Sequence, residues 1–273
     1  MFNIRLFFNR LGHSTHARKA GRTQLKAAKN GDREQFLALS ATYLNVAVTY
    51  FASSISEDAE TRTRRTVQLF ERLWQNIRYT ERLSDFEYML ARSLMESAPK
   101  NGPITSSDPL VTKLRLLAPD VRFAVIACKF ENWPRRWVAL ALRIRIPKLH
   151  RMLSEARCEL CGIGWESLAN EEKSCLQAIS ESLEKCPNMR INRELNARIK
   201  SFPRVASIKA QWLELRSELV EVRLRYLLDQ KEREHLLDRI LESVAETPSP
   251  RPPLVDRVVN TVHFSRHGQI KVS

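Results

Sequence analysis

Apolar residues recur three or four positions apart along most of this chain, which is the spacing of one face of an α-helix. The first stretch of this kind has Asn30 or Asp32 available as an N-cap. Its apolar positions are Phe36, Leu39, Tyr43 or Leu44, Val46 and Tyr50. The chain has only seven glycines in 273 residues, and few stretches alternate β-branched with polar residues. The sequence therefore predicts an all-α protein.

Breaks in this pattern divide the chain into segments. The linker at 99–109 is rich in Pro, Gly and Ser, and the sequence TPSPRPP stops the last helix. The expected segments are a basic N-terminal arm at 1–23, a small helical domain at 24–98, the linker at 99–109, a second small helical domain at 110–157, a C-terminal helical extension at 158–246 and a disordered basic tail at 247–273.

Two more helices are expected inside the first domain. The apolar positions of one are Val67, Phe70, Leu73, Trp74 and Ile77. The other is expected to start on Ser84 or Asp85, because both side chains are good N-caps.

Positive charge is concentrated in two segments. The net charge is +14 at pH 7, and residues 1–31 contain seven Lys or Arg and no acid. Residues 111–157 contain eleven Lys or Arg against three acids. A hydrated surface usually mixes the two signs, whereas a field of one sign attracts polyanions. This distribution favours nucleic acid as a partner.

The segment VALALRIRIPKLHRMLSEAR at 138–157 consists of two amphipathic stretches separated by a short break. The apolar positions are Val138, Ala139 and Leu142 before the break, and Leu149, Leu153 and Ala156 after it. Two helices joined by a short turn, the second of them basic, are typical of a DNA-binding helix-turn-helix. The alternative is an ordinary amphipathic helix whose basic face is only hydrated.

Two parts of the chain together resemble the bacterial extracytoplasmic-function sigma factors. NGDREQFLAL (30–39), FERLW (70–74) and LARSL (90–94) are similar to the first conserved helical region of that family. LLAPDVRFAVIACKF (116–130) followed by PRRWVALALRIRIPKLHRMLSEAR (134–157) is similar to its C-terminal helix-turn-helix. The resemblance covers about residues 24–157. It implies transcription initiation, with duplex DNA, core RNA polymerase and an anti-sigma or other protein as partners.

The resemblance also assigns roles around the helix-turn-helix. It implies a first helix that begins at Pro134, a turn at Arg143 to Arg145 and a recognition helix from Ile146 to Arg157. The early residues of a recognition helix reach base edges, while basic residues in the turn and at helix starts hold phosphates. The base-edge candidates are Lys148, His150 and Arg151, the phosphate-binding candidates are Arg135, Arg136, Arg143 and Arg145, and Ser154 and Arg157 complete the DNA-facing set.

Phe86 and Tyr88 occupy aromatic positions at which stacking on unpaired bases is possible. The alternative for both is a place in the core. Arg143 stands where a tight turn favours a small residue.

The chain departs from the family before FERLW and after LARSL. The family grips the polymerase with an acidic, glutamine-containing stretch, whereas RTRRTVQLF here places Arg62, Arg64 and Arg65 in that region. LARSL is followed by MESAPKNGP instead of a basic run. A partner that binds acids would repel these arginines. The alternatives are therefore a helix-turn-helix regulator or adaptor that binds DNA without engaging polymerase, and a helical protein-interaction module.

A heptad seam lies in the C-terminal extension. Ile208, Trp212, Leu215, Leu219, Val222 and Tyr226 are spaced 4-3-4-3-4, as in a coiled coil or a helical hairpin. Asp229 and Arg233 interrupt the seam, and a coiled coil of about three heptads is marginal alone. The sequence predicts a helix folded back on the same chain in a mostly monomeric protein, and a dimerising coiled coil is the alternative.

No motif points to catalysis, a cofactor or a membrane span. The chain has six scattered His, no Gly-rich phosphate loop and no nucleophile elbow, so an enzyme is not expected. No apolar run approaches eighteen residues. Cys158, Cys161, Cys175 and Cys186 could in principle ligate zinc, but the later pair lacks knuckle spacing, and idle thiols are expected.

The cysteine count and the N-terminus bear on the compartment. An odd count of five suits the reducing cytoplasm. The basic N-terminal residues lack the long apolar core of a secretory signal. The alternative there is a membrane-surface or targeting role for Phe2, Ile4, Leu6, Phe7 and Phe8.

Overall fold

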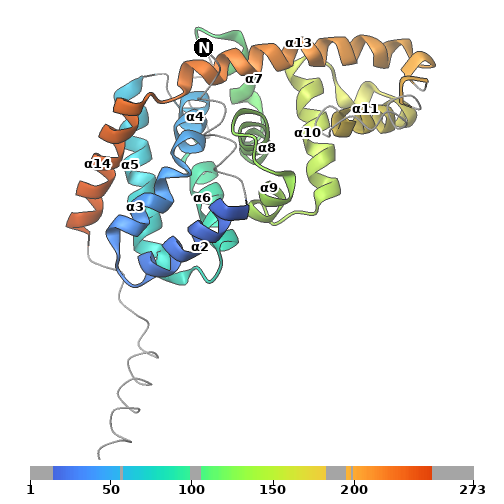
Figure 1. Cartoon of the computed structure of the whole chain (residues 1–273). Helices are drawn as coiled ribbons and strands as arrows, with labels where there is room; N and C mark the ends of the chain where they lie inside the picture. Colours follow the sequence, from blue (N-terminus) through green and yellow to red (C-terminus); the bar gives the residue numbers. More distant parts are fainter. Residues whose placement is uncertain (1–14, 56–57, 99–105, 183–194, 198, 248–273) are drawn as a thin grey trace, which may run out of the picture.

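The described residues of the protein form helices and no strand, which confirms the all-α prediction (Figure 1). The structure is a computed structural model that describes residues 15–55, 58–98, 106–182, 195–197 and 199–247. No single described helix is long and apolar enough to cross a membrane, and the bent pair 33–41 and 44–54 passes that test only when taken together.

The described part of the N-terminal half contains five α-helices and one short 3-10 turn. They are α2 (Thr15–Lys29), α3 (Arg33–Ala41), α4 (Leu44–Ser54), α5 (Ala59–Asn76), the 3-10 turn Ile77–Tyr79 and α6 (Leu83–Ser97). Asp32 caps α3 as expected, because its carboxylate accepts a hydrogen bond of 3.0 Å from the Gln35 amide. The expected N-cap of α6 is wrong: Arg82 is the N-cap, and Asp85 accepts its amide N–H at 2.8 Å.

The boundary expected at residue 23 falls inside a helix. Helix α2 runs from Thr15 to Lys29, so only residues 1–14 of the expected arm remain, and they lie outside the described residues. Leu25 and Ala28 attach α2 to the core, while Lys19, Arg22 and Lys26 are exposed. The charge that the sequence places on an arm is therefore partly carried by a packed helix.

One apolar core joins the two segments that flank the linker at 99–109. The second segment contains α7 (Pro109–Leu116), α8 (Pro119–Val125), the π-helical turn Ile126–Phe130, α9 (Arg135–Ala141) and α10 (Ile146–Leu160). Trp133 packs edge-on against Tyr43 and Phe123, with ring centroids 5.5 and 6.1 Å apart. Tyr43 also packs on Phe86 at 5.4 Å. Aromatic rings from both segments therefore meet in a single cluster.

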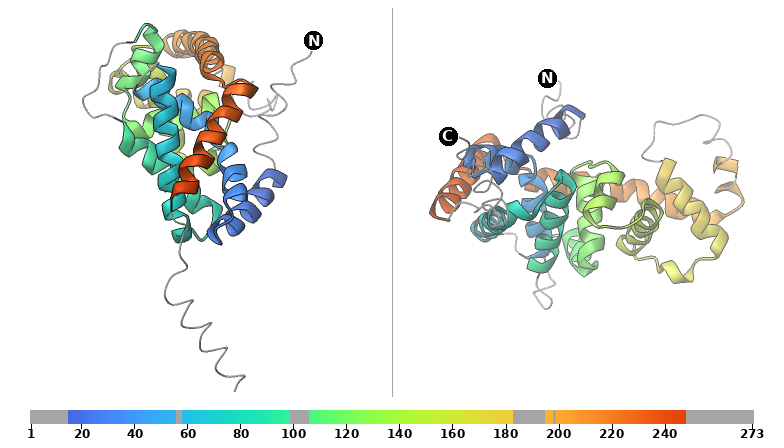
Figure 2. Two further views of the ribbon diagram at one scale, coloured as in Figure 1. Left: turned by 90° about the vertical axis from the view of Figure 1, so that its left-hand side faces the viewer. Right: turned by 90° about the horizontal axis from the view of Figure 1, so that it is seen from below.

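The C-terminal helices return to this core. After the 3-10 turn Trp165–Ser167 come α11 (Asn170–Ser182), α13 (Pro203–Tyr226) and α14 (Gln230–Glu246). Figures 1 and 2 show α13 along one edge of the molecule, between α11 at one end and α14 at the other. Helix α14 packs against α5 and α3. It ends at Glu246, where the sequence predicts the stop, and the tail from residue 248 lies outside the described residues.

The predicted fold-back of the heptad seam is confirmed. Ile208 and Trp212 belong to an apolar cluster with α10 and α11, and Leu215, Leu219 and Val222 belong to the main core. Tyr226 is half-buried. The interruption at Asp229 is a helix boundary, because Asp229 and Glu232 form a capping box that starts α14. The seam is thus covered within one chain and is not free to form the alternative coiled coil.

A buried carboxyl group lies beneath the break between α13 and α14. Glu131 is 5% exposed, and burial raises its pKa to about 7, which Arg223 and Arg233 only partly oppose. Arg233 also donates to the carbonyl of Ala41, at the end of α3. This carboxyl is therefore mainly protonated at acidic pH and charged in a low-dielectric site at alkaline pH.

Trp212→Ala is expected to lower the free energy of unfolding by about 3 kcal/mol or more, because it empties a large buried volume in the smaller cluster. Urea unfolding measures this change. Leu140→Ala removes an apolar side chain that is 53% exposed and should change stability by less than about 0.5 kcal/mol. Equal effects of the two substitutions would contradict the placement of Trp212.

The free energy of unfolding of Glu131→Gln is expected to rise relative to that of the wild type as the pH increases from 5 to 8. The folded-state pKa of Glu131 lies above its unfolded value, so its contribution to stability is present at low pH and declines as the pH approaches 7. Glutamine does not titrate, so the difference in unfolding free energy should shift by up to about 3 kcal/mol. Urea unfolding at both pH values, with Glu218→Gln as the exposed control, measures it, and a pH-independent difference would refute the assignment.

Candidate nucleic-acid interface

A short turn joins helices α9 and α10, in the segment where a helix-turn-helix is predicted. Helix α9 ends at Ala141, and α10 begins after Arg145, with Pro147 in its first turn. Arg143 lies between them with φ 52°, the left-handed conformation that a non-glycine residue rarely adopts. The Ile144 amide donates to the carbonyl of Ala139 at 2.9 Å and closes the turn. The turn at 143–145 and the start of the second helix are therefore confirmed.

The solvent-facing part of this unit is basic. Arg136, on the first turn of α9, and Arg143 and Arg145, in the turn, are exposed. Lys148 and Arg151 are exposed on the first two turns of α10. Arg151 pairs with Glu155 on the next turn at 2.7 Å, an exposed contact that a phosphate or base could replace at little cost. Five of the predicted side chains thus remain available on one helix-turn-helix.

Ser154 and Arg157, in the second half of α10, are buried, which corrects their assignment to the DNA-facing set. Ser154 is fully buried and its hydroxyl donates to the His150 carbonyl at 3.0 Å. Arg157 is 9% exposed, donates to the hydroxyl of Ser180 on α11 and lies 5.3 Å from the ring centroid of Trp212. Burial lowers the pKa of Arg157 to about 10. Arg157 therefore links α10 to α11 and α13.

Arg135 is half-buried and forms a hydrogen bond within the protein. Its guanidinium donates to the carbonyl of Ser180 at 2.9 Å, and burial lowers its pKa. Arg122 is buried as well and donates to the carbonyls of Leu114 and Leu117, both at 2.9 Å, which caps the end of α7. The net charge of residues 111–157 therefore overstates the charge that a ligand meets.

The stacking role considered for Phe86 is wrong, because its ring is fully buried in the main core. Tyr88 is half-buried, and the guanidinium of Arg143 lies 3.7 Å from the centroid of its ring. This cation–π contact fixes the turn of the helix-turn-helix to α6. Tyr88 therefore supports the turn and does not present this face of its ring to an unpaired base.

Helix α2 adds basic residues that the sequence did not assign to the site. Arg18 lies 4.2 Å from the ring centroid of Trp137 on α9 and pairs with the buried Glu87 at 3.0 Å. Lys19 and Arg22 follow on the same helix and are exposed. The absence of acids from residues 1–31 was the available signal, but no pattern linked that segment to α9.

His150 is engaged by the C-terminal extension. Its Nδ1 lies 2.8 Å from Oε1 of Glu181, near the end of α11. This places a carboxylate next to the exposed basic side chains of α10. The contact lowers the positive field of the surface and removes His150 from the free base-edge candidates.

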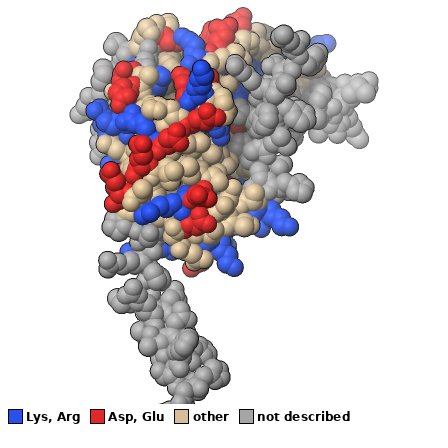
Figure 3. Space-filling model, turned by 60° about the vertical axis from the view of Figure 1, so that its left-hand side comes forward, with Lys and Arg blue, Asp and Glu red and all other residues tan. Residues whose placement is uncertain are grey.

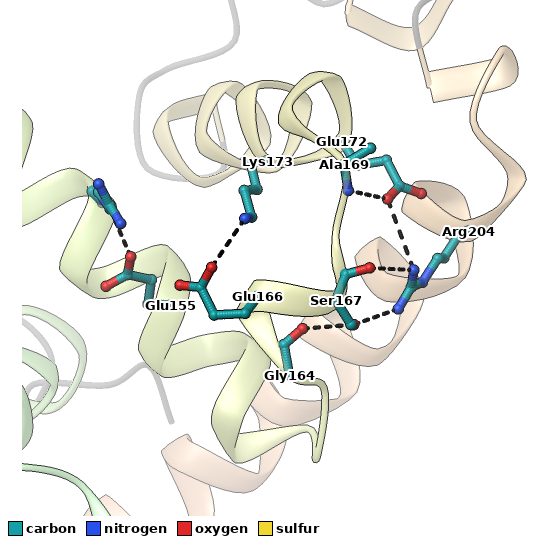
Figure 4. A network of polar contacts seen from close by, with 9 residues as sticks. Glu155, Gly164, Glu166, Ser167, Ala169, Glu172, Lys173 and Arg204 are labelled. Atoms are coloured by element: carbon teal, nitrogen blue, oxygen red, sulfur yellow. Dashed lines mark hydrogen bonds and ion pairs between the residues drawn. The ribbon is translucent and has the colours of Figure 1, made fainter.

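A polar network joins the start of α13 to the 3-10 turn and to the start of α11 (Figure 4). Arg204, at the start of α13, donates to the carbonyl and the hydroxyl of Ser167 at 3.0 and 2.7 Å. It also lies 3.9 Å from Glu172, whose carboxylate accepts the Ala169 amide at 2.9 Å. Helices α11 and α13 are therefore fastened to each other as well as to α10.

The surface that the resemblance assigns to polymerase contact is partly covered. Helix α14 packs on α5, where Arg239 pairs with Glu60 at 3.2 Å, and Arg62 lies 5.5 Å from the ring centroid of Tyr226. Arg64 and Arg65 remain exposed. Figure 3 shows acidic and basic side chains interspersed on this side of the molecule. The described surface there is mixed in charge, unlike the helix-turn-helix.

The described cysteines offer no metal site. No three His, Cys, Asp or Glu side chains in the described part of the chain gather as metal ligands, and Cys186 lies outside it. Cys158 and Cys161 are free, and burial raises their pKa values to about 12 and about 11, which keeps both thiols protonated. Cys158 and Cys175 pack as apolar residues in the smaller cluster.

Comparisons with protein-family models, curated proteins and solved structures find no match to this chain. The likeness to extracytoplasmic-function sigma factors therefore depends on the quoted motifs alone.

Glu181→Gln is expected to strengthen binding to duplex DNA about two- to fivefold at low salt, because it removes a negative charge from the edge of the basic surface. Fluorescence anisotropy with a labelled duplex measures the change. Glu171→Gln makes the same chemical change at the exposed start of α11 and should leave the affinity unchanged. An equal gain in both variants would show that only the total charge matters.

Proposed function

We propose that this protein binds duplex DNA through the unit α9–turn–α10. The observation that carries the proposal is the set of exposed basic side chains on the turn and on the first two turns of α10. In a helix-turn-helix these are the positions that reach the major groove, while the rest of the helix packs on the protein. Lys148 and Arg151 are the residues for base edges.

Phosphate contacts come from the flanks of this helix. Arg136, Arg143 and Arg145 line the approach to α10, and Lys19 and Arg22 extend it along α2. Lys and Arg in these places fix the register of a helix on the duplex without reading sequence. Exposed basic side chains before α10 and on α2 are suited to contact phosphates beside the groove that α10 would enter.

The covered face of α5 favours a DNA-binding regulator or adaptor over an initiation factor that engages polymerase. Helix α14 lies where the resemblance expects the polymerase clamp, and exposed arginines take the place of acids beside it. We expect the full chain not to copurify with core RNA polymerase. A stable complex would instead favour the sigma-factor function, with the same DNA site.

Binding of the full chain to duplex DNA is expected to weaken steeply with salt. About five phosphate contacts give a slope near −4.5 in a plot of log affinity against log salt concentration. Anisotropy titrations between 50 and 200 mM salt, about a fourfold range, measure the slope. A slope near zero, or no binding at low salt, would refute the proposal.

Lys148→Ala and Arg151→Ala are expected to weaken preferred sequences by about 1–3 kcal/mol and to relax sequence choice. Arg136→Ala should weaken all sequences alike, because its expected contact is with phosphate. Lys231→Ala, on the exposed start of α14, removes the same charge far from the site and serves as the control. Identical behaviour of all four variants across sequences would show that α10 does not read bases.

A further inference from the structure

Helix α13 carries a second apolar stripe on the side opposite to its buried seam. The stripe consists of six exposed residues with the same 4-3-4-3-4 spacing, namely Ala206, Ala210, Leu213, Ser217, Val220 and Leu224. Each lies two positions before a residue of the buried seam. Because two residues turn an α-helix by about 200°, the two stripes face nearly opposite directions.

The large side chains of this stripe are open to solvent. Leu213, Val220 and Leu224 are 44%, 47% and 62% exposed, and they are three of the seven large apolar side chains exposed in the described chain. Figure 1 and the left view of Figure 2 both show α13 at an edge of the molecule. The stripe is thus a linear apolar surface without a neighbour among the described helices.

The charges beside the stripe have the order of a self-pairing coiled coil. With Ala210, Ser217 and Leu224 at heptad position a, and Leu213 and Val220 at d, Lys209 and Arg216 fall at g, and Glu214 and Glu221 fall at e. In a parallel pair, each g residue faces the e residue five positions later on the other helix. These pairs are Lys209 with Glu214 and Arg216 with Glu221, and both are of opposite sign.

An antiparallel pair would bring g against g and e against e. It would place basic residues beside basic residues and acids beside acids. Arg216, Glu214 and Glu221 are exposed, and none of them forms an ion pair with another described residue, so their charges are available to a second chain. Lys209 makes only a 3.4 Å contact with Asn196.

We propose that two copies of this chain associate through the outer stripe of α13 as parallel helices. The helix is already held in place by its inner seam, so association does not have to form it. The stripe contains two alanines and one serine and spans 19 residues, from Ala206 to Leu224. Such a small interface gives a dissociation constant on the order of micromolar. Arg157 and Cys158, in the second half of α10, pack with α13, while Lys148 and Arg151 on its first turns are exposed.

Sedimentation velocity of the full chain from about 1 to 200 μM is expected to show a monomer–dimer equilibrium with a micromolar midpoint. Leu213→Asp and Val220→Asp should each keep the chain monomeric over this range, because they place a charge in the interface. Both sites are exposed, so the thermal unfolding midpoint should not change. Glu218→Lys changes an exposed charge off the stripe and should dimerise like wild type. A wild-type chain that stays monomeric at every concentration would overturn the proposal.

Charge reversal tests whether the partner is a second copy in the proposed register. The double variant Lys209→Glu with Arg216→Glu has only acids beside the stripe, and Glu214→Lys with Glu221→Lys has only bases. Each should lose self-association, and an equimolar mixture of the two should regain a dimer. If both charge-reversed variants dimerised as the wild type does, the proposed pairing of Lys209 with Glu214 and Arg216 with Glu221 would be overturned.

Orientation is tested by Ala210→Cys. In a parallel pair the two introduced thiols meet and can form a disulfide under mild oxidation, whereas an antiparallel pair places position 210 opposite position 220. We expect a covalent dimer with Ala210→Cys and none with wild type treated in the same way. A non-covalent dimer that never cross-links at this position would overturn the parallel arrangement.

Discussion

The inner seam of helix α13 is buried in two different apolar clusters, one at each end of the helix. Ile208 and Trp212 pack with α10 and α11, and Leu215, Leu219 and Val222 pack with the main core. Because one helix packs into both clusters, α10, α11 and the main core are held at fixed positions relative to one another. The capping box at Asp229 then reverses the chain so that α14 covers α5. The arrangement of the whole C-terminal half follows from this double burial.

The same burial defines the surface that α10 can offer. In the second half of α10, Arg157 contacts Ser180 and Trp212. Exposed basic side chains lie on the first two turns of α10 and on the turn that precedes it. Arg143 and Arg18 add cation–π contacts that attach the unit to α6 and α2. The proposed DNA site is therefore preorganised, and α11 limits its extent by placing Glu181 beside His150.

Much of the fold could be predicted from spacing and end signals. The break between the two amphipathic stretches of 138–157, the Asp32 cap, the helix stop before residue 248 and the inward-facing seam of α13 all follow from local rules, whereas the bounds of the turn at 143–145 came from the resemblance. Such rules describe one helix at a time. The assignment of Ser154 and Arg157 to the outer face of α10 missed contacts with distant residues, since Ser180, which Arg157 contacts, lies 23 residues later in the chain. Phe86 was uncertain for the same reason, since a ring in an amphipathic helix fits a core and a binding surface equally well.

Charge was the least reliable guide to the site. A count over residues 111–157 includes Arg122, which caps a helix inside the protein, and Arg157, which lies under α11. It omits Lys19 and Arg22, which are exposed on α2, the helix whose Arg18 contacts Trp137 of α9. Sequence gives the total charge of a segment, whereas a polyanion responds to the charge that reaches the surface.

The division of α10 into a buried and an exposed half has an evolutionary consequence. Positions 145, 146, 148 and 151 can vary without disturbing the packing of the helix, because their side chains are exposed, whereas Leu149, Leu153 and Arg157 are fixed by their neighbours. A change of target sequence then needs no compensating change in stability, since substitutions at exposed positions are close to neutral for folding. Under the proposed function, α10 separates the residues selected for recognition from those selected for folding. Lineages of this chain could therefore drift in sequence preference while they keep the same architecture.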